Sequence, residues 1–411
     1  AALTRLIGQL FLDTAWLGSI KWASILAGAA AGYWLTHRRS RIVDKLILIG
    51  AGWSLLMLAA FPMWISITLG LKATVSVALL SMAFKALITE KTEQGYQSRV
   101  GDKNLEDLPE GDVLVRVAWS SLNYKDALSA SGNKGVTRSF PHTPGIDAAG
   151  VVEEAGDGPF SVGDAVICTG YDLGMNTSGG YGDYIRVPAE WLAPLPAGLS
   201  ARDAMVLGTA GLTAALCVEA LIDTGLQPEQ GEVLVTGATG GVGSVAVSIL
   251  SNLGFKVVAA TGKQDAHDWL RDLGAADIIG RDALLEGIEK PVLKPRWAGV
   301  VDCVGGDILV NALKSLQYGG SAACCGLTAS PKLENATVFP FILRGVNLLG
   351  VDSVELPCEV KQQMWQLLAS DWRPALDKLE SREVTREQLP DCFTEILAGK
   401  LRGRVVVKIN P

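Results

Sequence analysis

The residues best suited to chemistry are four closely spaced glycines. Glycine lacks the Cβ atom that keeps a bulky anion away from a backbone turn, and free N–H groups at a helix start bind phosphate oxygens. Apolar residues 233–235 precede this turn as a strand would, and apolar residues 245–253 follow it as a helix would. This order predicts a dinucleotide site, and the alternative is a purely structural turn. The glycines are Gly237, Gly240, Gly241 and Gly243.

Within this turn we expect five residues to bind the cofactor: Gly237, Thr239, Gly240, Gly241 and Val242.

The second strand-like run, 256–261, indicates which dinucleotide binds. NAD sites usually place an acid after this strand to hold the ribose 2′-hydroxyl. Here Thr261, Gly262 and Lys263 stand there, and Arg281 follows the next strand-like run. Cationic groups favour a 2′-phosphate, so we predict NADPH. Two alternatives stay open, namely that Asp265 reaches the ribose and that Lys263 is an ordinary solvated lysine.

Composition separates two parts of the 411-residue chain, whose net charge is −7. Residues 1–81 carry seven Lys or Arg against two Asp, whereas the remainder is acidic and has no basic stripe. Nucleic-acid binding is therefore not expected. Seven cysteines without a CxxC pair favour a reduced, cytoplasmic setting for the acidic part. The three histidines are dispersed, so no metal site is predicted.

The first 81 residues read as a hydrophobic helical hairpin. Residues 16–35 and 46–71 are each long and apolar enough to span a bilayer. The basic loop 37–41 would stay on the cytoplasmic side. We expect a two-span membrane hairpin or a fused foreign segment, and the alternative is a pair of buried helices in a soluble protein.

From Met82 onward, three stretches carry a resemblance to a known family. They are Ser-Ser-Leu-Asn-Tyr-Lys-Asp at 120–126, Phe-Pro-Phe-Ile-Leu-Arg at 339–344 and Gly-Val-Asp-Ser at 350–353. This part resembles the medium-chain dehydrogenase/reductase superfamily. It is most similar to the zinc-independent YhdH/YhfP-like quinone oxidoreductases and their NADPH-dependent acryloyl-CoA reductases.

The resemblance implies an α/β fold in which a GroES-like β-barrel catalytic domain is joined to a Rossmann domain with a doubly wound parallel sheet. We expect the catalytic domain at 82–207, the Rossmann domain at 208–338 and a return to the catalytic domain at 339–411. It also implies a homodimer.

The zinc-dependent branch of this superfamily does not fit the residues present. Its catalytic cysteine would align with Asn123, and its Gly-His-Glu with Gly145, Ile146 and Asp147. Only Cys168 lies where that branch has a four-cysteine lobe. A zinc site needs N or S ligands that these positions lack, so we expect metal-free chemistry.

The resemblance also places site residues. Asn123, Tyr124 and Asp126 would face the nicotinamide as catalytic residues, with Tyr124 contacting the cofactor. The Tyr124 phenol would protonate the substrate α-carbon, unless it only packs on the cofactor and solvent supplies the proton.

Three further residues, Leu327, Ile342 and Ser353, would line the nicotinamide by the same resemblance. For Leu327 and Ile342 the alternative is ordinary core packing.

Three functions follow as hypotheses. The first is NADPH-dependent reduction of the activated C=C bond of acryloyl-CoA to propionyl-CoA. The second is a broad NADPH:quinone oxidoreductase, which needs no contacts to CoA. The third is a membrane-anchored, NADPH-binding protein without catalysis, suggested by residues 1–81. Turnover of an enoyl-CoA and of a quinone by the purified protein distinguishes them.

Overall fold

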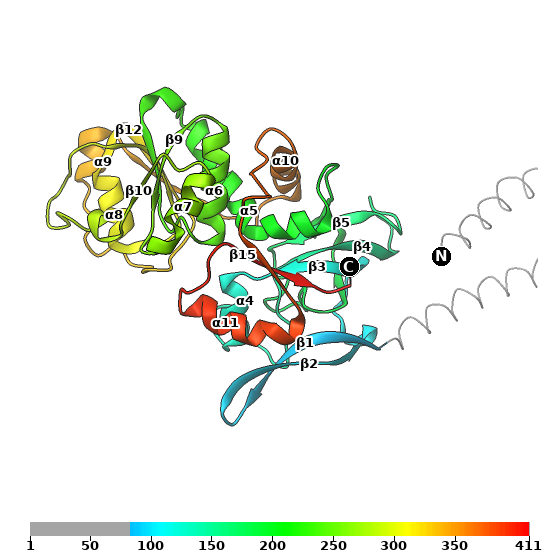
Figure 1. The fold of residues 1–411 in the computed structure, drawn as a ribbon. Helices are drawn as coiled ribbons and strands as arrows, with labels where there is room; N and C mark the ends of the chain where they lie inside the picture. The colour runs from blue at the N-terminus through cyan, green and yellow to red at the C-terminus, as the bar shows by residue number, and fades with distance from the viewer. Residues whose placement is uncertain (1–82, 411) are drawn as a thin grey trace, which may run out of the picture. The chain divides into compact units, whose positions relative to one another are not determined.

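The computed structural model describes residues 83–410 (Figure 1). The hairpin expected for residues 1–81 lies outside the described residues. The described chain begins with a two-stranded ribbon, in which β1 (Ala83–Thr92) pairs with β2 (Gly95–Asn104). Phe84, the second residue of β1, is buried.

A seven-stranded sheet forms the GroES-like part, in the order β14-β15-β3-β4-β5-β7 with β6 also paired to β3. Most neighbours are antiparallel, whereas β14 and β15 are parallel. The last strand of the chain thus pairs with one of the first, as the predicted return requires. The strands are β3 (Val113–Ser121), β4 (Asp147–Ala155), β5 (Ala165–Thr169), β6 (Tyr184–Val187), β7 (Leu192–Pro194), β14 (Ser381–Val384) and β15 (Arg404–Lys408).

A six-stranded parallel sheet forms the Rossmann part, in the order β10-β9-β8-β11-β12-β13. This sheet continues past the boundary expected at residue 338, because β13 pairs with β12. The strands are β8 (Glu232–Val235), β9 (Lys256–Ala260), β10 (Asp277–Ile279), β11 (Trp297–Asp302), β12 (Leu316–Cys324) and β13 (Asn347–Gly350).

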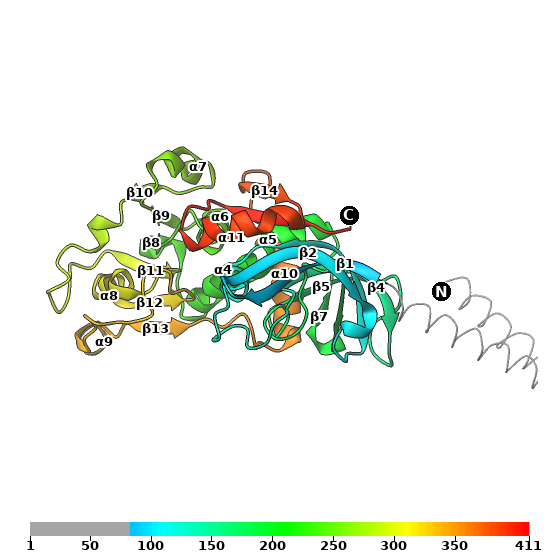
Figure 2. The same ribbon diagram turned by 90° about the horizontal axis from the view of Figure 1, so that it is seen from below.

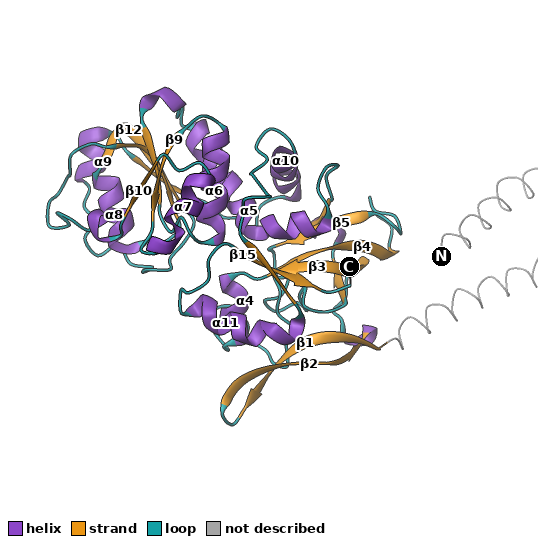
Figure 3. Cartoon of the chain, viewed as in Figure 1, coloured by secondary structure: helices purple, strands orange, loops and turns teal. Residues whose placement is uncertain are grey.

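Helices cover both faces of this parallel sheet (Figure 3). Val233 and Val235 of β8 pack in one core with α5 and α6, whereas Leu234 packs in a second core with α8. Burial on both faces explains why β8 is uniformly apolar after its first residue. The helices are α5 (Ala201–Asp223), α6 (Gly241–Asn252), α7 (His267–Asp272), α8 (Gly306–Lys314) and α9 (Phe339–Arg344).

Helix α5 joins the two sheets. Ser200 caps its first turn by accepting the N–H of Asp203, and Gly208 interrupts it with a φ of 53°. Among the described residues α5 alone is long and apolar enough to cross a membrane, yet 78% of its apolar stretch is buried inside the fold. It packs against α6, β3 and β4 and is therefore a core helix.

The remaining helices are short. α4 (Tyr124–Ala130) and α11 (Leu389–Leu397) pack on each other near the β1–β2 ribbon, and α10 (Cys358–Ala369) packs on α5 (Figure 2). Single 3-10 turns occur at Leu105–Asp107, Ala189–Trp191, Pro228–Gln230, Gln264–Ala266, Asp282–Leu284 and Arg386–Gln388.

Candidate functional site

The glycine turn connects β8 to α6 as predicted. Gly237 has a φ of +59°, which only glycine adopts readily. A Cβ atom on Gly243 would lie 2.4 Å from the carbonyl oxygen of Gly237, so this glycine lets α6 pack directly on the turn. Gly240 caps α6 without a side-chain hydrogen bond. The first N–H groups of α6 therefore lack a side-chain partner, and the turn fits a pyrophosphate.

Two other predicted contacts of the turn lie beside the last strand. The Gly403 N–H donates to the Thr239 carbonyl at 2.9 Å. The Arg404 guanidinium lies against Gly241, since a Cβ atom added to this glycine would be 2.9 Å from Arg404 Nη1. Thr239 is buried and Val242 is half-buried in the first turn of α6. The segment preceding β15 thus packs against the predicted nucleotide turn.

The predicted 2′-phosphate residues come together after β9. The Lys263 N–H donates to Thr261 Oγ1 at 3.1 Å. A Cβ atom on Gly262 would lie 2.7 Å from Arg281 Nε, so the guanidinium lies against the Gly262 backbone. Burial lowers the pKa of Lys263 against the opposing effect of Asp265, and the charges of Arg402 and Arg281 add to the lowering. Several cations therefore share this end of the sheet.

Arg402 is a residue that sequence reasoning missed. Its Nη1 lies 3.4 Å from Asp265 Oδ2, so Asp265 pairs with a guanidinium, and a contact of Asp265 with the ribose stays a prediction. Lys263 Nζ donates to the carbonyl of neighbouring Leu401 at 2.5 Å. The basic run 400–404 was visible in the sequence, but only the return of β15 brings it to Lys263.

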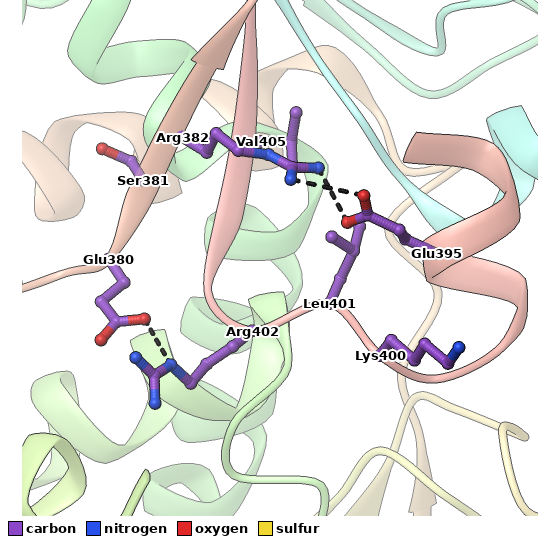
Figure 4. Close-up of a pocket in the computed structure, with 8 residues that line it drawn as sticks. All are labelled: Glu380, Ser381, Arg382, Glu395, Lys400, Leu401, Arg402 and Val405. Carbon is purple, nitrogen blue, oxygen red and sulfur yellow. Dashed lines mark hydrogen bonds and ion pairs between the residues drawn. The ribbon is translucent and has the colours of Figure 1, made fainter. Parts of the chain in front are cut away.

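A cavity of about 480 Å³ adjoins these cations (Figure 4). In it Arg402 pairs with Glu380 at 2.5 Å and Arg382 pairs with Glu395 at 2.9 Å. Lys400 adds a third cation, so the walls carry more positive than negative groups. The lining residues are Glu380, Ser381, Arg382, Glu395, Lys400, Leu401, Arg402 and Val405.

At the other end of the site, Asn123 caps α4 and Asp126 completes the capping box. Asp126 Oδ2 accepts the Asn123 N–H at 2.7 Å, and its Oδ1 accepts the N–H groups of Gly145 and Ile146 at 3.1 and 2.8 Å. Burial and nearby Asp147 raise the pKa of Asp126 to about 7, against the opposing effect of the N–H donors. Fully buried Asp126 therefore holds the backbone around half-exposed Tyr124.

Behind Asn123 lies a buried polar cluster centred on Asp147. Asp147 Oδ2 accepts from Asn123 Nδ2 at 2.8 Å and from the Thr209 N–H at 2.9 Å. Ser121 Oγ also donates to this carboxylate. Arg404 donates to Ser121 Oγ at 2.9 Å and lies 3.4 Å from Asn123 Oδ1. Only its place in the basic run 400–404 could have pointed to Arg404 from the sequence.

This cluster does not suit zinc. Asn123, Ile146 and Asp147 stand at the expected ligand positions, and a buried guanidinium, Arg404, already supplies the positive charge there. Within residues 83–410, no three His, Cys, Asp or Glu side chains gather as metal ligands.

The three residues expected to line the nicotinamide differ in burial. Leu327 is 56% exposed and Ile342 is 70% exposed, so the alternative of core packing is wrong for both. Ser353 is buried, and its Oγ lies 2.8 Å from Thr213 Oγ1. Because Thr213 Oγ1 also lies 2.7 Å from the carbonyl of Thr209, Ser353 connects to the Asp147 cluster. Contacts of Leu327 and Ile342 with a cofactor stay a prediction.

Sequence and structure comparisons agree with this architecture. Residues 109–197 match the alcohol dehydrogenase GroES-like domain family, and residues 241–370 match the zinc-binding dehydrogenase family. The acrylyl-CoA reductase AcuI of Ruegeria pomeroyi is 47% identical over 331 residues, which is 80% of this chain and 99% of that protein. Bacillus subtilis YhfP, provisionally named a quinone oxidoreductase, is 47% identical over 80% of this chain and its own full length.

Solved structures of related proteins indicate the same family. Salmonella enterica YhdH in complex with NADP has a TM-score of 0.76 at 44% identity, covering 79% of this chain and 99% of that one. Bacillus subtilis YhfP with NAD bound has a TM-score of 0.77 at 47% identity, covering 80% of this chain and 100% of that one. With this identity over the full length of its relatives, the chain belongs to the medium-chain dehydrogenase/reductase superfamily, in the group that includes YhdH, YhfP and AcuI.

Proposed function

We propose that this protein is an NADPH-dependent reductase of activated C=C bonds, with acryloyl-CoA as substrate and propionyl-CoA as product. The relative named acrylyl-CoA reductase supports the substrate, because it is 47% identical across nearly its whole length. The glycine turn supports binding of a dinucleotide, because the first N–H groups of α6 have no side-chain cap.

The cations after β9 are the observation that carries the choice of NADPH. One relative was solved with NADP and another with NAD, so membership of the group alone does not decide. Here Thr261 and Lys263 replace the acid of NAD sites, Arg281 lies against Gly262, and Asp265 pairs with Arg402. A 2′-phosphate would meet Lys263 and Arg281 on this side, and NADH has no phosphate there to pair with them.

In this proposal, residues of the chain position the reactants and donate a proton to the substrate. Bound NADPH supplies the hydride that the substrate β-carbon accepts. Asp126 and the Asp147 cluster fix the start of α4, which presents Tyr124 at the surface of the site. We propose that Tyr124 Oη donates a proton to the substrate α-carbon as charge develops on the thioester oxygen. If Tyr124 only packs on the cofactor, water delivers that proton instead.

A quinone oxidoreductase is the second candidate, favoured by the name given to Bacillus subtilis YhfP. Steady-state assays with NADPH and either acryloyl-CoA or 1,4-benzoquinone separate the two. Our proposal expects the larger kcat/KM with acryloyl-CoA. A larger value with benzoquinone, together with no effect of added CoA as inhibitor, contradicts it.

We further propose that the chain forms a homodimer through the edge of the parallel sheet. Among the described strands β13 pairs only with β12, and its Leu348 is exposed. Neighbouring α9 exposes Ile342 and Leu343, and an open apolar sheet edge favours association. Light scattering of Leu343→Glu against the unchanged chain tests this. Membrane association through residues 1–81 is likewise a proposal, tested by detergent partitioning.

A further inference from the structure

Three cysteines meet where β11 and β12 end. Asp302 and Cys324 are aligned partners on these neighbouring strands, so Cys303 and Cys325 follow them side by side. Their Sγ atoms lie 3.9 Å apart, and both residues are half-buried. Cys217 lies beneath them on α5 and is fully buried. No step of the proposed reduction uses these thiols.

This arrangement has the dimensions of a disulfide site. Neighbouring strands lie about 4.8 Å apart, and disulfides join Cα atoms roughly 4.4–6.8 Å apart. Closing the two sulfurs to the ~2.05 Å of a disulfide needs a movement of only about 2 Å, which side-chain rotation supplies. We propose that Cys303 and Cys325 are a reversible oxidation site for hydroperoxides, and that their disulfide weakens dinucleotide binding at the adjoining glycine turn.

The neighbours of the two thiols assign them different roles. Cys325 Sγ lies 3.9 Å from Cys303 Sγ and 3.4 Å from the Asp302 carbonyl oxygen. Its neighbours Cys217 and Cys303 lower the pKa of Cys325, which favours Cys325 as the attacking thiol of the pair. The same contact and burial raise the pKa of Cys303, which stays a thiol. Burial raises the pKa of adjacent Cys324 to about 11, so Cys324 is a poor nucleophile despite its position.

The oxidation balances with one hydroperoxide per disulfide. The Cys325 thiolate attacks one peroxide oxygen, the O–O bond breaks, and the departing oxygen takes a proton to leave as an alcohol or as water. Cys325 is then a sulfenic acid. The Cys303 sulfur attacks that sulfur, the S–O bond breaks, and the thiol proton leaves with the hydroxyl as a second water. Two electrons pass from the thiols to the peroxide.

Cys303 links this chemistry to the nucleotide turn. Its N–H donates to Thr236 Oγ1 at 3.0 Å, directly before Gly237. A Cβ atom on Gly237 would lie 3.4 Å from the Cys303 Cβ, so the cysteine packs beneath the turn. Both contacts are made by the backbone and Cβ of Cys303, so the disulfide acts on Gly237 where its closure shifts these atoms, whereas rotation of the thiol alone leaves both contacts in place. This consequence rests on the proposed dinucleotide site, whereas disulfide formation does not.

The test uses the full chain treated with one equivalent of hydrogen peroxide. Peptide mass mapping should show one cross-link between Cys303 and Cys325, removed by dithiothreitol. Fluorescence titration should show NADPH binding weakened about tenfold or more in the oxidised protein. Cys303→Ser should abolish both changes, whereas the half-buried control Cys358→Ser should show both. Cys217→Ser should slow the cross-link without removing it.

Other results would overturn the proposal. A cross-link from Cys217 to Cys325, or sulfinic acid at Cys325 without a cross-link, shows that the residues are wrongly assigned. A mapped Cys303–Cys325 cross-link with unchanged NADPH affinity refutes the coupling to the turn. If the reduced protein fails to bind NADPH at all, the proposed function fails, and the cross-link map still decides the oxidation site.

Discussion

Tyr124 and Asp126 are two residues apart in the sequence, yet their surroundings indicate different roles. Asp126 accepts three backbone N–H groups and is fully buried, so it cannot touch a substrate without unfolding the start of α4. Tyr124 is half-exposed at the first position of that helix. Of the three residues expected to be catalytic, we therefore assign Asp126 and Asn123 a positioning role and retain Tyr124 as the proton donor.

Replacing Tyr124 with Phe tests that assignment. A general acid typically contributes a hundredfold or more, so kcat should fall by about 10² while the KM for NADPH changes little. Phe keeps the ring, so a tyrosine that only packs on the cofactor predicts an unchanged kcat. Solvent isotope effects on both forms show whether the proton step has become limiting.

Lys263→Glu tests cofactor choice. One charge-assisted phosphate contact contributes about 1.5–3 kcal/mol, so KM for NADPH should rise roughly ten- to a hundredfold. KM for NADH should change far less. Exposed Lys332→Glu, which pairs only locally with Glu334, is the matched control and should alter neither value. Equal use of NADH and NADPH by the unchanged protein would count against the argument.

The raised pKa of Asp126 predicts that the stability of the fold depends on pH. Its folded pKa of about 7 lies above the ordinary 3.8, so the folded state holds the proton more tightly than the unfolded state. Its contribution to the free energy of unfolding is therefore complete below about pH 4 and is lost as pH rises to about 7. Asp126→Asn should be less stable overall but should lose this part of the slope. Thermal midpoints of both forms between pH 4 and 8 measure it, and parallel curves would disprove it.

At the scale of elements, the segment from β8 to β9 was predictable because its chemistry is local. Apolar runs, glycine spacing and the residues after β9 all lie within about thirty residues, as in other dinucleotide-binding units. The cations of Arg402 and Arg404 were not predictable, because their positions depend on β15 pairing with β3 across most of the chain. Apolar type alone did not distinguish a core position from an open site at Leu327 and Ile342, and only the resemblance placed them at the site; both are exposed.

Gly243→Ala tests the packing of α6 on its turn. The added Cβ would lie 2.4 Å from the Gly237 oxygen and 2.8 Å from the Ala238 Cα, both of them backbone atoms that cannot rotate away. We expect NADPH binding to weaken at least tenfold, with a lower thermal midpoint. Gly158→Ala is the control, because its new Cβ would meet only Ala189 Cβ at 3.8 Å. Equal behaviour of the two variants would show that the turn tolerates the shift.

At the scale of the whole molecule, residues 83–410 contain both sheets and their cores. The relatives match about four fifths of the chain with essentially their full length. These two facts indicate that residues 83–410 fold around their own cores without residues 1–81.

Deletion of residues 1–81 should therefore leave an active protein. We expect the shortened chain to keep the thermal midpoint, NADPH affinity and kcat/KM of the full chain, because β1 begins at Ala83. The full chain should partition into detergent and the shortened chain should not, since the apolar stretch 46–71 is absent from it. If the shortened chain is unfolded or inactive, the domain boundary predicted after residue 81 is wrong.

The position of β15 has a consequence for how the protein is made. This strand is translated after every other described strand, yet it lies between β14 and β3 and carries in Arg404 the cation of the Asp147 cluster. The parallel sheet, complete at Gly350, can form while the ribosome is still adding residues. The catalytic sheet cannot close until β15 emerges, so the Trp119–Ser121 end of β3 waits without its β15 partner, while residues 113–116 can already pair with β6. A chain stalled before β15 emerges would hold a folded nucleotide half beside an open catalytic half, the form most exposed to proteases and chaperones.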